Sequence, residues 1–434
     1  MTDRAALSPV DHPLRAPGVD ELHARPFPVL EAPCRAVFLA LMPNPSGGPV
    51  QREAAHQQLS DLIGDRAEVP PLGATHWSGQ LGETSYKWES HTEFNSFWAF
   101  TPGASEIPFA PSDLEVFPSG WQQQAPGARM AALHIEVLEM PAERSQMLAL
   151  CRAWFVAESL AVAEIVDGAA VIAGDFRLDG AGYMRFAVFV EPGTGPRRIG
   201  RIVQRICEVE TYRAMSMLGL FEARRLGARL DVIDPRLLDV VAQLETGAKA
   251  GPQAEQALHA LLEISAELEQ MAVESSFRYG ATAAYAAIVE QRISILREQR
   301  VEGHQTFTEF MTRRHDPAMR TTRAGEARLA RMSERAARAA ELLRTRVDVE
   351  RSAQNQQLLT SMDRRSDLAL RLQHTVEGLS VVAISYYAHG LAKTLLAPLA
   401  ARLEISANLL GAGLVLPVML AVWLFLRRLR KSIH

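Results

Sequence analysis

The end of the chain constrains the fold most, because an unbroken helical run leads into apolar segments. Between Gly325 and Gly378 lie 52 residues without glycine or proline, which favours one long helix. Leu409–Leu426 follows later, with 18 residues and no charge. At about 1.5 Å per residue such a helix is about 27 Å long, close to the hydrocarbon thickness of a bilayer. The basic residues behind it predict a membrane boundary: Arg427, Arg428, Arg430 and Lys431.

A second apolar segment, Gly378–Ala401, precedes this one and contains one lysine, Lys393. With a short connector between them, the two segments predict a two-helix transmembrane hairpin. Basic residues are enriched before the first segment and after the second, so we expect both termini in the cytoplasm of a bacterial inner membrane. The alternative is that Gly378–Ala401 is a buried helix of a soluble body and that only the second segment spans.

The first apolar segment is unusually polar for a lipid-facing helix. Hydroxyl and imidazole groups lose their hydrogen-bond partners in lipid, so we expect them to face protein or a water-filled axis. An aromatic belt with a helix-packing face is the alternative reading. The lipid bilayer and further copies of the chain, in a homo-oligomer, are the expected partners. The residues concerned are Ser380, Ser385, Tyr386, Tyr387 and His389.

The stalk carries apolar residues at helical spacing, which predicts coiled-coil-like packing against a neighbouring helix. A helix of this length needs such lateral support, because isolated helices gain most of their stability from a packed face. The support would come from preceding helices, from sister subunits or from both. The early positions are Leu329, Met332, Ala336, Ala339 and Leu343, and the later ones are Leu358, Met362, Leu368, Leu372 and Val376.

Composition restricts the function classes. A net charge of −4 with interspersed basic residues predicts no nucleic-acid partner. Three widely separated cysteines, Cys34, Cys151 and Cys207, indicate a reducing compartment and argue against a disulfide framework or a zinc knuckle. The N-terminus has no apolar core of signal-peptide length, so we expect no export of the N-terminal domain.

Upstream of the stalk the pattern mixes strands with helices. Strands are expected at 131–138, 169–178 and 183–190, and helices at 142–164, 196–226, 252–278, 281–301 and 304–319. The predicted fold class is an α+β cytosolic domain followed by a long helical stalk and a C-terminal two-helix transmembrane hairpin. The expected domains are a loop-rich α+β region (1–128), a sheet with helices (129–250), a helical layer with the stalk (251–375) and the hairpin with its basic tail (376–431).

The sharpest candidate for chemistry lies in the aromatic, strand-like segment Tyr86–Phe100. In a strand Glu89, His91 and Glu93 project to one face, where two carboxylates and an imidazole would hold a divalent metal cation or move a proton. The alternative is a solvated strand face opposite a tryptophan-packed one. No other cofactor is indicated, because phosphate-loop, nucleophile-elbow and zinc-protease motifs are all missing from the sequence.

The N-terminal segment offers a weaker candidate. Its imidazole and basic groups would bind an anion or anchor a structural arm on the body. They are His12, Arg15, His23 and Arg25, with Glu21 among them.

Several specific runs resemble a bacterial family of uncharacterised membrane-anchored proteins, and the resemblance covers most of the chain. It implies membrane anchoring and supplies no activity. The runs are His12-Pro-Leu-Arg15, Glu21-Leu-His-Ala-Arg-Pro-Phe27, Trp88-Glu89-x-His91-Thr-Glu-Phe94, Leu343-Arg-Thr-Arg-Val-Asp348, Ser361-Met-Asp-Arg-Arg365, and Thr375-Val-Glu-Gly-Leu-Ser-Val381 with Ile384-Ser-Tyr-Tyr387.

The architecture also resembles CorA-type divalent-cation transporters, in which homopentamers line a pore with the first span. In that family a Gly-Met-Asn signature follows the first span; here Tyr386-Tyr-Ala-His389-Gly390 stands at that position instead. The resemblance implies an inner-membrane protein that transports a divalent cation. A membrane-anchored binding or scaffolding protein is the alternative, and a membrane-bound enzyme that uses Glu89, His91 and Glu93 is a third possibility.

Overall fold

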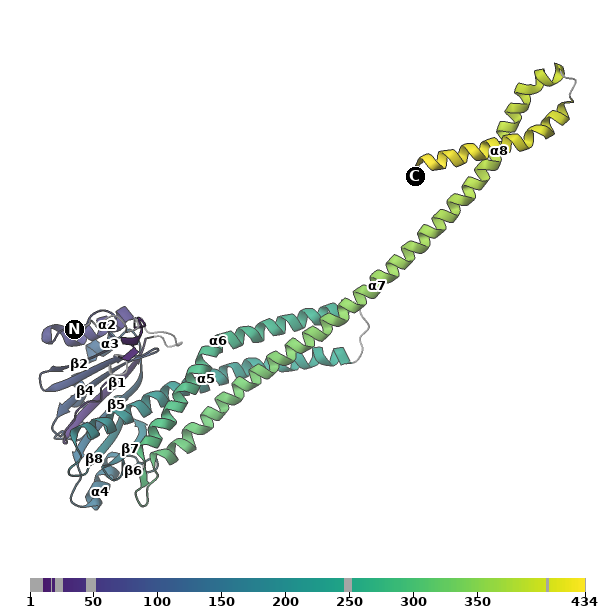
Figure 1. The fold of residues 1–434 in the computed structure, drawn as a ribbon. Helices are drawn as coiled ribbons and strands as arrows, with labels where there is room; N and C mark the ends of the chain where they lie inside the picture. Colours follow the sequence, from purple (N-terminus) through teal and green to yellow (C-terminus); the bar gives the residue numbers. More distant parts are fainter. Residues whose placement is uncertain are drawn as a thin grey trace, which may run out of the picture. The chain divides into compact units, whose positions relative to one another are not determined.

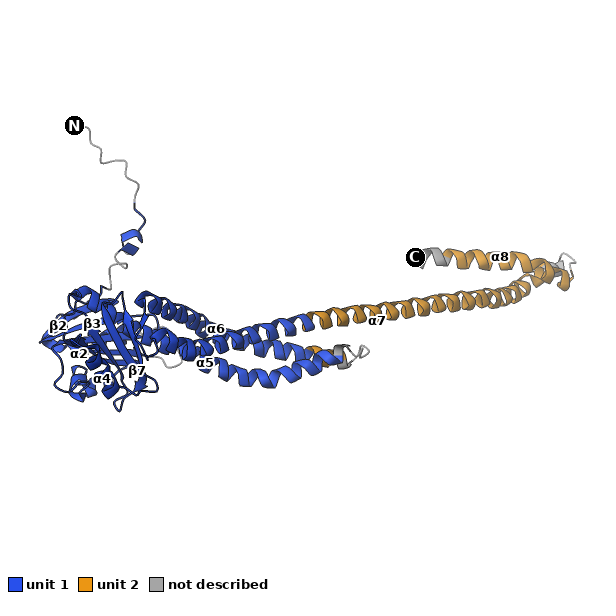
Figure 2. Ribbon diagram, turned by 90° about the horizontal axis from the view of Figure 1, so that it is seen from below, with its two compact units in different colours: residues 1–243, 259–339 blue, residues 244–258, 340–434 orange. Residues whose placement is uncertain are grey.

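The computed structural model describes residues 11–16, 18–19, 26–43, 52–245, 252–402 and 406–433. The chain divides into two compact units (Figure 2). The first, called the body here, comprises residues 1–243 and 259–339; the second comprises residues 244–258 and 340–434. Three residues of the N-terminal candidate, Glu21, His23 and Arg25, lie outside the described residues, as do the side chains of Arg430 and Lys431.

The body is built on one mixed sheet, in which nine strands are described (Figure 1). Their order across the sheet is β2-β3-β4-β1-β5-β8-β7-β6-β9. All neighbours are antiparallel except β5 and β8, and β1 and β5 join the two halves of the sheet. The strands are β1 Cys34–Met42, β2 His76–Leu81, β3 Thr84–Ser90, β4 Asn95–Pro102, β5 Ala128–Glu139, β6 Ala161–Ile165, β7 Ala170–Leu178, β8 Met184–Val190 and β9 Gln299–Arg300.

Both faces of the sheet are covered, because alternate residues of each strand point to opposite sides. Phe38 of β1 packs in the cluster that includes Ile202 of the long helix α5, whereas Leu39 packs with Leu59 of α2 on the other face. The second half of that other face is covered by α4, through residues such as Met147. The short helices are α2 Arg52–Ile63, η1 Gly64–Arg66, η2 Pro111–Val116, α3 Ser119–Gln123 and α4 Arg144–Trp154.

Three long helices follow, and they run further than the sequence indicated. They are α5 Pro196–Glu245, α6 Pro252–Leu296 and α7 Phe307–Arg402. The expected division of α6 near residue 280 and the expected break at Pro317 are both wrong. Buried neighbours explain the second result, since Ala318 and Met319 pack into the body and hold the helix through the proline. The predicted helix at 142–164 is also corrected, because α4 ends at Trp154 and β6 begins at Ala161.

Within the body the three long helices are tied together by polar contacts. Arg328 of α7 pairs with Asp231 of α5 at 2.7 Å, and Arg229 of α5 pairs with Glu274 of α6 at 3.1 Å. Deeper in, the Ser216 hydroxyl lies 2.8 Å from the Nε2 atom of His315. The expected support of the stalk by preceding helices is therefore present along its first part.

The C-terminal end of the chain holds one helix that is long and apolar enough to cross a membrane, among the residues the structure describes. This is the segment Ala407–Arg428 of α8 (Ala407–Ile433), with 22 residues and a mean hydropathy of 2.5. Only 6% of its most apolar stretch is buried, so it is no core helix of this chain. The predicted first span, Gly378–Ala401, does not qualify, because Lys393, His389 and its hydroxyl groups make it too polar. The structure thus supports one candidate span and not a transmembrane hairpin.

Candidate metal centre

The structure does not place Glu89, His91 and Glu93 on one strand face. Strand β3 ends at Ser90, and the chain turns before β4 begins at Asn95. Glu89 lies 2.9 Å from the Lys87 ammonium and 3.5 Å from the His91 ring. Glu93 instead pairs with Arg278 of α6 at 2.6 Å. Two of the three residues are neighbours, and the third is engaged elsewhere.

The same turn sends the aromatic residues on its two sides to opposite faces of the sheet. Trp88 packs on the α2 face of the sheet, whereas Phe94 belongs to the cluster on the α5 face. The sequence gives no sign of this change of face, because the residues on each side of the turn alternate between the two faces as a strand should.

The Glu89 carboxylate is buried and ionised. Burial by itself raises the pKa of this group, but the His91 hydrogen bond and the Lys87 charge outweigh burial and lower the pKa to about 2. Lys87 also donates to the Gln204 side chain at 3.1 Å and to the Pro26 carbonyl at 3.0 Å. This arrangement is a buried ion pair, and Lys87 joins it to α5.

The polar residues of the first apolar segment take up different environments. Tyr386 and Tyr387 are 75% and 71% exposed. Ser380 donates to the Val376 carbonyl at 2.8 Å, while Ser385 is buried and its hydroxyl has no hydrogen-bond partner among the described residues. The Nδ1 atom of His389 likewise lacks one within that part of the chain.

At the basic end of α8, the side chains of two of the four predicted boundary residues are described. The Arg427 guanidinium lies 5.1 Å from the ring centroid of Trp423, and Arg428 is exposed.

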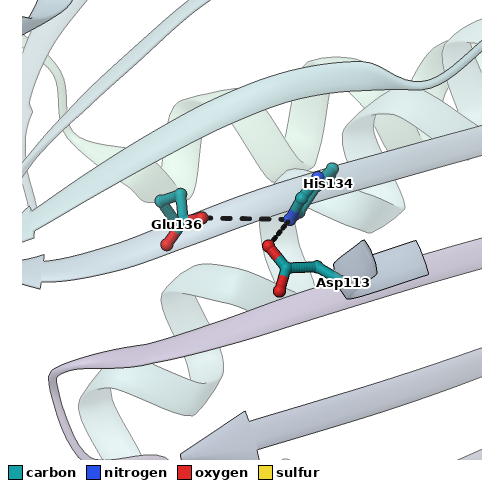
Figure 3. A group of neighbouring side chains, drawn as sticks. All are labelled: Asp113, His134 and Glu136. Atoms are coloured by element: carbon teal, nitrogen blue, oxygen red, sulfur yellow. Dashed lines mark ion pairs between the residues drawn. The ribbon is translucent and has the colours of Figure 1, made fainter. Parts of the chain in front are cut away.

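A cluster that the sequence did not reveal gathers on β5, the middle strand in the order of the sheet. Figure 3 shows the imidazole of His134 between the carboxylates of Asp113 and Glu136. His134 and Glu136 alternate along β5 and therefore point to the same face. Asp113 comes from η2, the short 3-10 helix after β4, which places its carboxylate against the imidazole. The three ligand atoms lie within 4.8 Å of one another.

The distances in this cluster are longer than hydrogen bonds. The Nε2 atom of His134 lies 3.5 Å from Asp113 Oδ2 and 3.9 Å from Glu136 Oε1. Ligands that surround a zinc ion tetrahedrally at about 2.1 Å are about 3.4 Å apart, so these gaps are close to the edges of a metal coordination shell. A small movement of the side chains would bring all three into range.

His134 is the least satisfied member of the cluster. It is completely buried, and neither of its ring nitrogens has a hydrogen-bond partner in the part of the chain that the structure describes. A buried polar group without a partner costs about 1–3 kcal/mol, so it calls for an explanation. An ion bound between the imidazole and the two carboxylates would provide one.

Neighbouring groups orient both carboxylates. Arg35 lies opposite Glu136 on β1 and donates to Asp113 Oδ1 at 2.5 Å, while Ser105 donates to Asp113 Oδ2. The Phe109 amide donates to Glu136 Oε1 at 3.0 Å from a left-handed backbone with φ of 60°. A bulky residue seldom adopts that conformation, and such strain is concentrated at functional sites.

The electrostatics favour a neutral imidazole. Burial lowers the pKa of His134 to about 4, although the Asp113 charge opposes this change. Burial also raises the pKa of Glu136, against the effect of the Phe109 amide. A neutral imidazole has a lone pair available, which is the form that binds a metal ion.

One signal of this site was present in the sequence. The predicted strand at 131–138 contains a histidine and a glutamate at alternating positions, His134 and Glu136. Nothing in the periodicity could add Asp113, because it lies 21 residues before His134 in an irregular segment.

Two comparisons with known proteins bear on the identity of the chain. The sequence profile of DUF3422, described as a protein of unknown function, matches residues 10–433. No curated protein matches the chain. The expected resemblance to an uncharacterised family over most of the chain is thus confirmed, and neither comparison shows the resemblance to CorA-type transporters.

Proposed function

Because the chain belongs to the DUF3422 family, whose function is unknown, we propose a function from its geometry. It is a membrane-anchored protein whose body binds a divalent metal ion through Asp113, His134 and Glu136. The observation that carries this proposal is the fully buried imidazole of His134, which lies between two carboxylate oxygens and has no hydrogen-bond partner among the described residues. The divalent cation expected from the sequence is retained, but at different residues.

The ligand types indicate the class of metal. One imidazole with two carboxylates suits Zn²⁺, Mn²⁺ or Fe²⁺ better than Ca²⁺ or Mg²⁺, which prefer oxygen ligands alone. Arg35 donates to Oδ1 of Asp113, while Oδ2 accepts from Ser105 and also faces the imidazole. The ion would also join the two halves of the sheet, since η2 follows the first half and β5 begins the second.

The direct test is the metal content of the full-length protein purified in detergent. We expect close to one equivalent of a transition metal by mass spectrometry, and loss of most of it in His134→Gln and Glu136→Gln. His91→Gln is the matched control, because it removes the imidazole of the candidate predicted from sequence and should keep the metal. Metal-free wild-type protein that takes up no Zn²⁺, Mn²⁺ or Fe²⁺ on titration would refute the site.

The anchoring part of the proposal rests on α8. Its large apolar side chains are exposed, for example Leu409, Leu416 and Trp423, and a bilayer would cover them. Deletion of Ala407–Ile433 should release the protein from carbonate-washed membranes. A full-length chain that is extracted by carbonate would contradict the anchor.

The number of spans determines the side on which the C-terminus lies. A single span through α8 places the body and the basic tail on opposite sides of the membrane, whereas a hairpin leaves both in the cytoplasm. Labelling of a cysteine added after His434, in intact and in permeabilised cells, distinguishes the two. If both termini are cytoplasmic, as the sequence predicts, this cysteine is labelled only in permeabilised cells.

Cation transport is a second candidate, favoured by one observation. Ser385 and His389 are four residues apart on α7 and carry polar atoms without hydrogen-bond partners among the described residues. Ser385 is buried within its own chain, so assembly of a homo-oligomer would have to turn these groups toward an axis between copies. Flux of Mg²⁺, Zn²⁺ or Mn²⁺ into liposomes that contain the purified protein, reduced in Ser385→Ala, would support transport. The absence of flux for all three would favour the binding protein.

A further inference from the structure

A cavity of about 490 Å³ lies in the body between the beginning of α5 and the end of α6. Arg198, Arg201 and Arg205 line it from one face of α5, since residues three and four apart lie on the same side of a helix. Arg297 lines it from the end of α6. Apolar side chains complete the wall: Val166, Ile202 and Ile295.

Positive charge around this cavity exceeds negative charge. Arg292 lies near enough for its charge to lower the pKa of Arg205, and it brings the number of guanidinium groups to five. Two carboxylates pair with them: Glu208 with Arg292, and Asp167 with Arg297, each at 2.5 Å. Within the part of the chain that the structure describes, these five positive charges face two negative ones, and three of the guanidinium groups form no ion pair.

Two of the arginines have no polar partner among the described residues. Arg198 donates to the Val166 carbonyl at 2.6 Å, but Arg201 and Arg205 make no hydrogen bond or ion pair with any described residue. Both are half-buried. Burial lowers the pKa of Arg205, and the positive charge of Arg201 lowers it further. Like charges held together in a partly desolvated cavity repel each other, and a bound anion would remove that repulsion.

We propose that this cavity binds a phosphate-bearing small molecule of about nucleotide size. Guanidinium groups match phosphate oxygens with two parallel hydrogen bonds, and three uncompensated charges suit a multiply charged anion better than a single carboxylate. The volume lies in the usual range for small-molecule sites. The apolar wall would contact the uncharged part of the ligand. A soluble phosphorylated metabolite and a phospholipid headgroup share this chemistry.

The test is calorimetric titration of the full-length protein in detergent with three probes: pyrophosphate, ADP and a short-chain phosphatidic acid. We expect binding to at least one probe, weakened at least tenfold in Arg201→Met with Arg205→Met. Arg224→Met, an exposed position on the same helix, is the matched control and should bind like wild type. Binding to phosphatidic acid alone identifies a lipid source, and binding to pyrophosphate or ADP a soluble one.

The proposal fails if no probe binds to the wild-type protein, or if the double variant and the control bind equally well. Thermal unfolding shows whether a variant that does not bind is still folded. Without ligand, Arg205→Met alone should unfold at the same temperature as wild type or higher, because it relieves repulsion. The probe that binds should raise the unfolding temperature of wild type and Arg224→Met by more than that of Arg205→Met at the same probe concentration.

Discussion

Arg278 on α6 donates a hydrogen bond to the Glu93 carboxylate at 2.6 Å, joining residues 185 positions apart. The side chains are 10% and 1% exposed, and the Tyr285 hydroxyl donates to the second oxygen at 3.0 Å. Glu93 lies in the turn between β3 and β4, so this contact fastens the sheet to the helical layer. It also explains why a glutamate predicted as a metal ligand is engaged elsewhere.

Removal of either partner should destabilise the body strongly. Arg278→Met leaves a buried carboxylate without its charge partner, and we expect a loss of about 3–5 kcal/mol. Urea unfolding followed by tryptophan fluorescence measures it. Arg236→Met is the control, because Arg236 of α5 pairs with Glu267 of α6 at 3.5 Å on the exposed surface, and it should cost under about 1 kcal/mol. Equal losses in the two variants would contradict a buried, dominant pair.

Stability should depend on pH through Glu89. Its pKa of about 2 in the folded protein is below the ordinary 4.5, so its contribution is fully present above pH 4.5 and disappears as pH falls toward 2. The difference amounts to about 3 kcal/mol. The difference in the free energy of unfolding between wild type and Glu89→Gln should therefore shrink by that amount as the pH falls from about 5 to 2. A constant difference between them would show that Glu89 is not held in its ionised form.

Chelation should destabilise the wild-type body. A ligand that binds only the folded state stabilises it, by about 2.7 kcal/mol at a concentration one hundred times its dissociation constant. EDTA treatment should lower the unfolding temperature of wild type and of His91→Gln, and added Zn²⁺, Mn²⁺ or Fe²⁺ should restore it. His134→Gln should unfold at one temperature with or without chelator. A chelator effect that persists in His134→Gln would place the ion elsewhere.

The later part of the stalk should associate with a second copy of the chain. Its apolar positions, among them Leu358, Leu372 and Val376, are exposed, and residues 351–376 have no buried member. All three natural cysteines are buried, so an introduced one is the accessible thiol among the described residues. Leu372→Cys should form a cross-linked dimer in membranes, whereas His374→Cys, about 200° around the helix, should not. Equal cross-linking at both positions would exclude this face as the interface.

Local patterns predicted the elements that depend on near neighbours in the chain. The strand at 131–138, the hairpin formed by β7 and β8 and the long helical stalk are confirmed, since periodicity and turn residues determine them. The first apolar segment is not a candidate span, because its polar groups offset its apolar length. The predicted ends of these helices were also wrong. Buried contacts near Pro235 and Pro317 let α5 and α7 continue through residues that usually end a helix.

By itself the sequence determined the class of fold, the stalk and the apolar C-terminal helix, all of which follow from runs of adjacent residues. Only the tertiary structure decided which polar groups meet. The pairing of β1 with β5 and the position of η2 bring Arg35 and Asp113 to His134 and Glu136, and the packing of α5 against α6 gathers the arginines around Arg205. Such contacts join residues far apart in the chain, and no periodicity within a single segment contains that information.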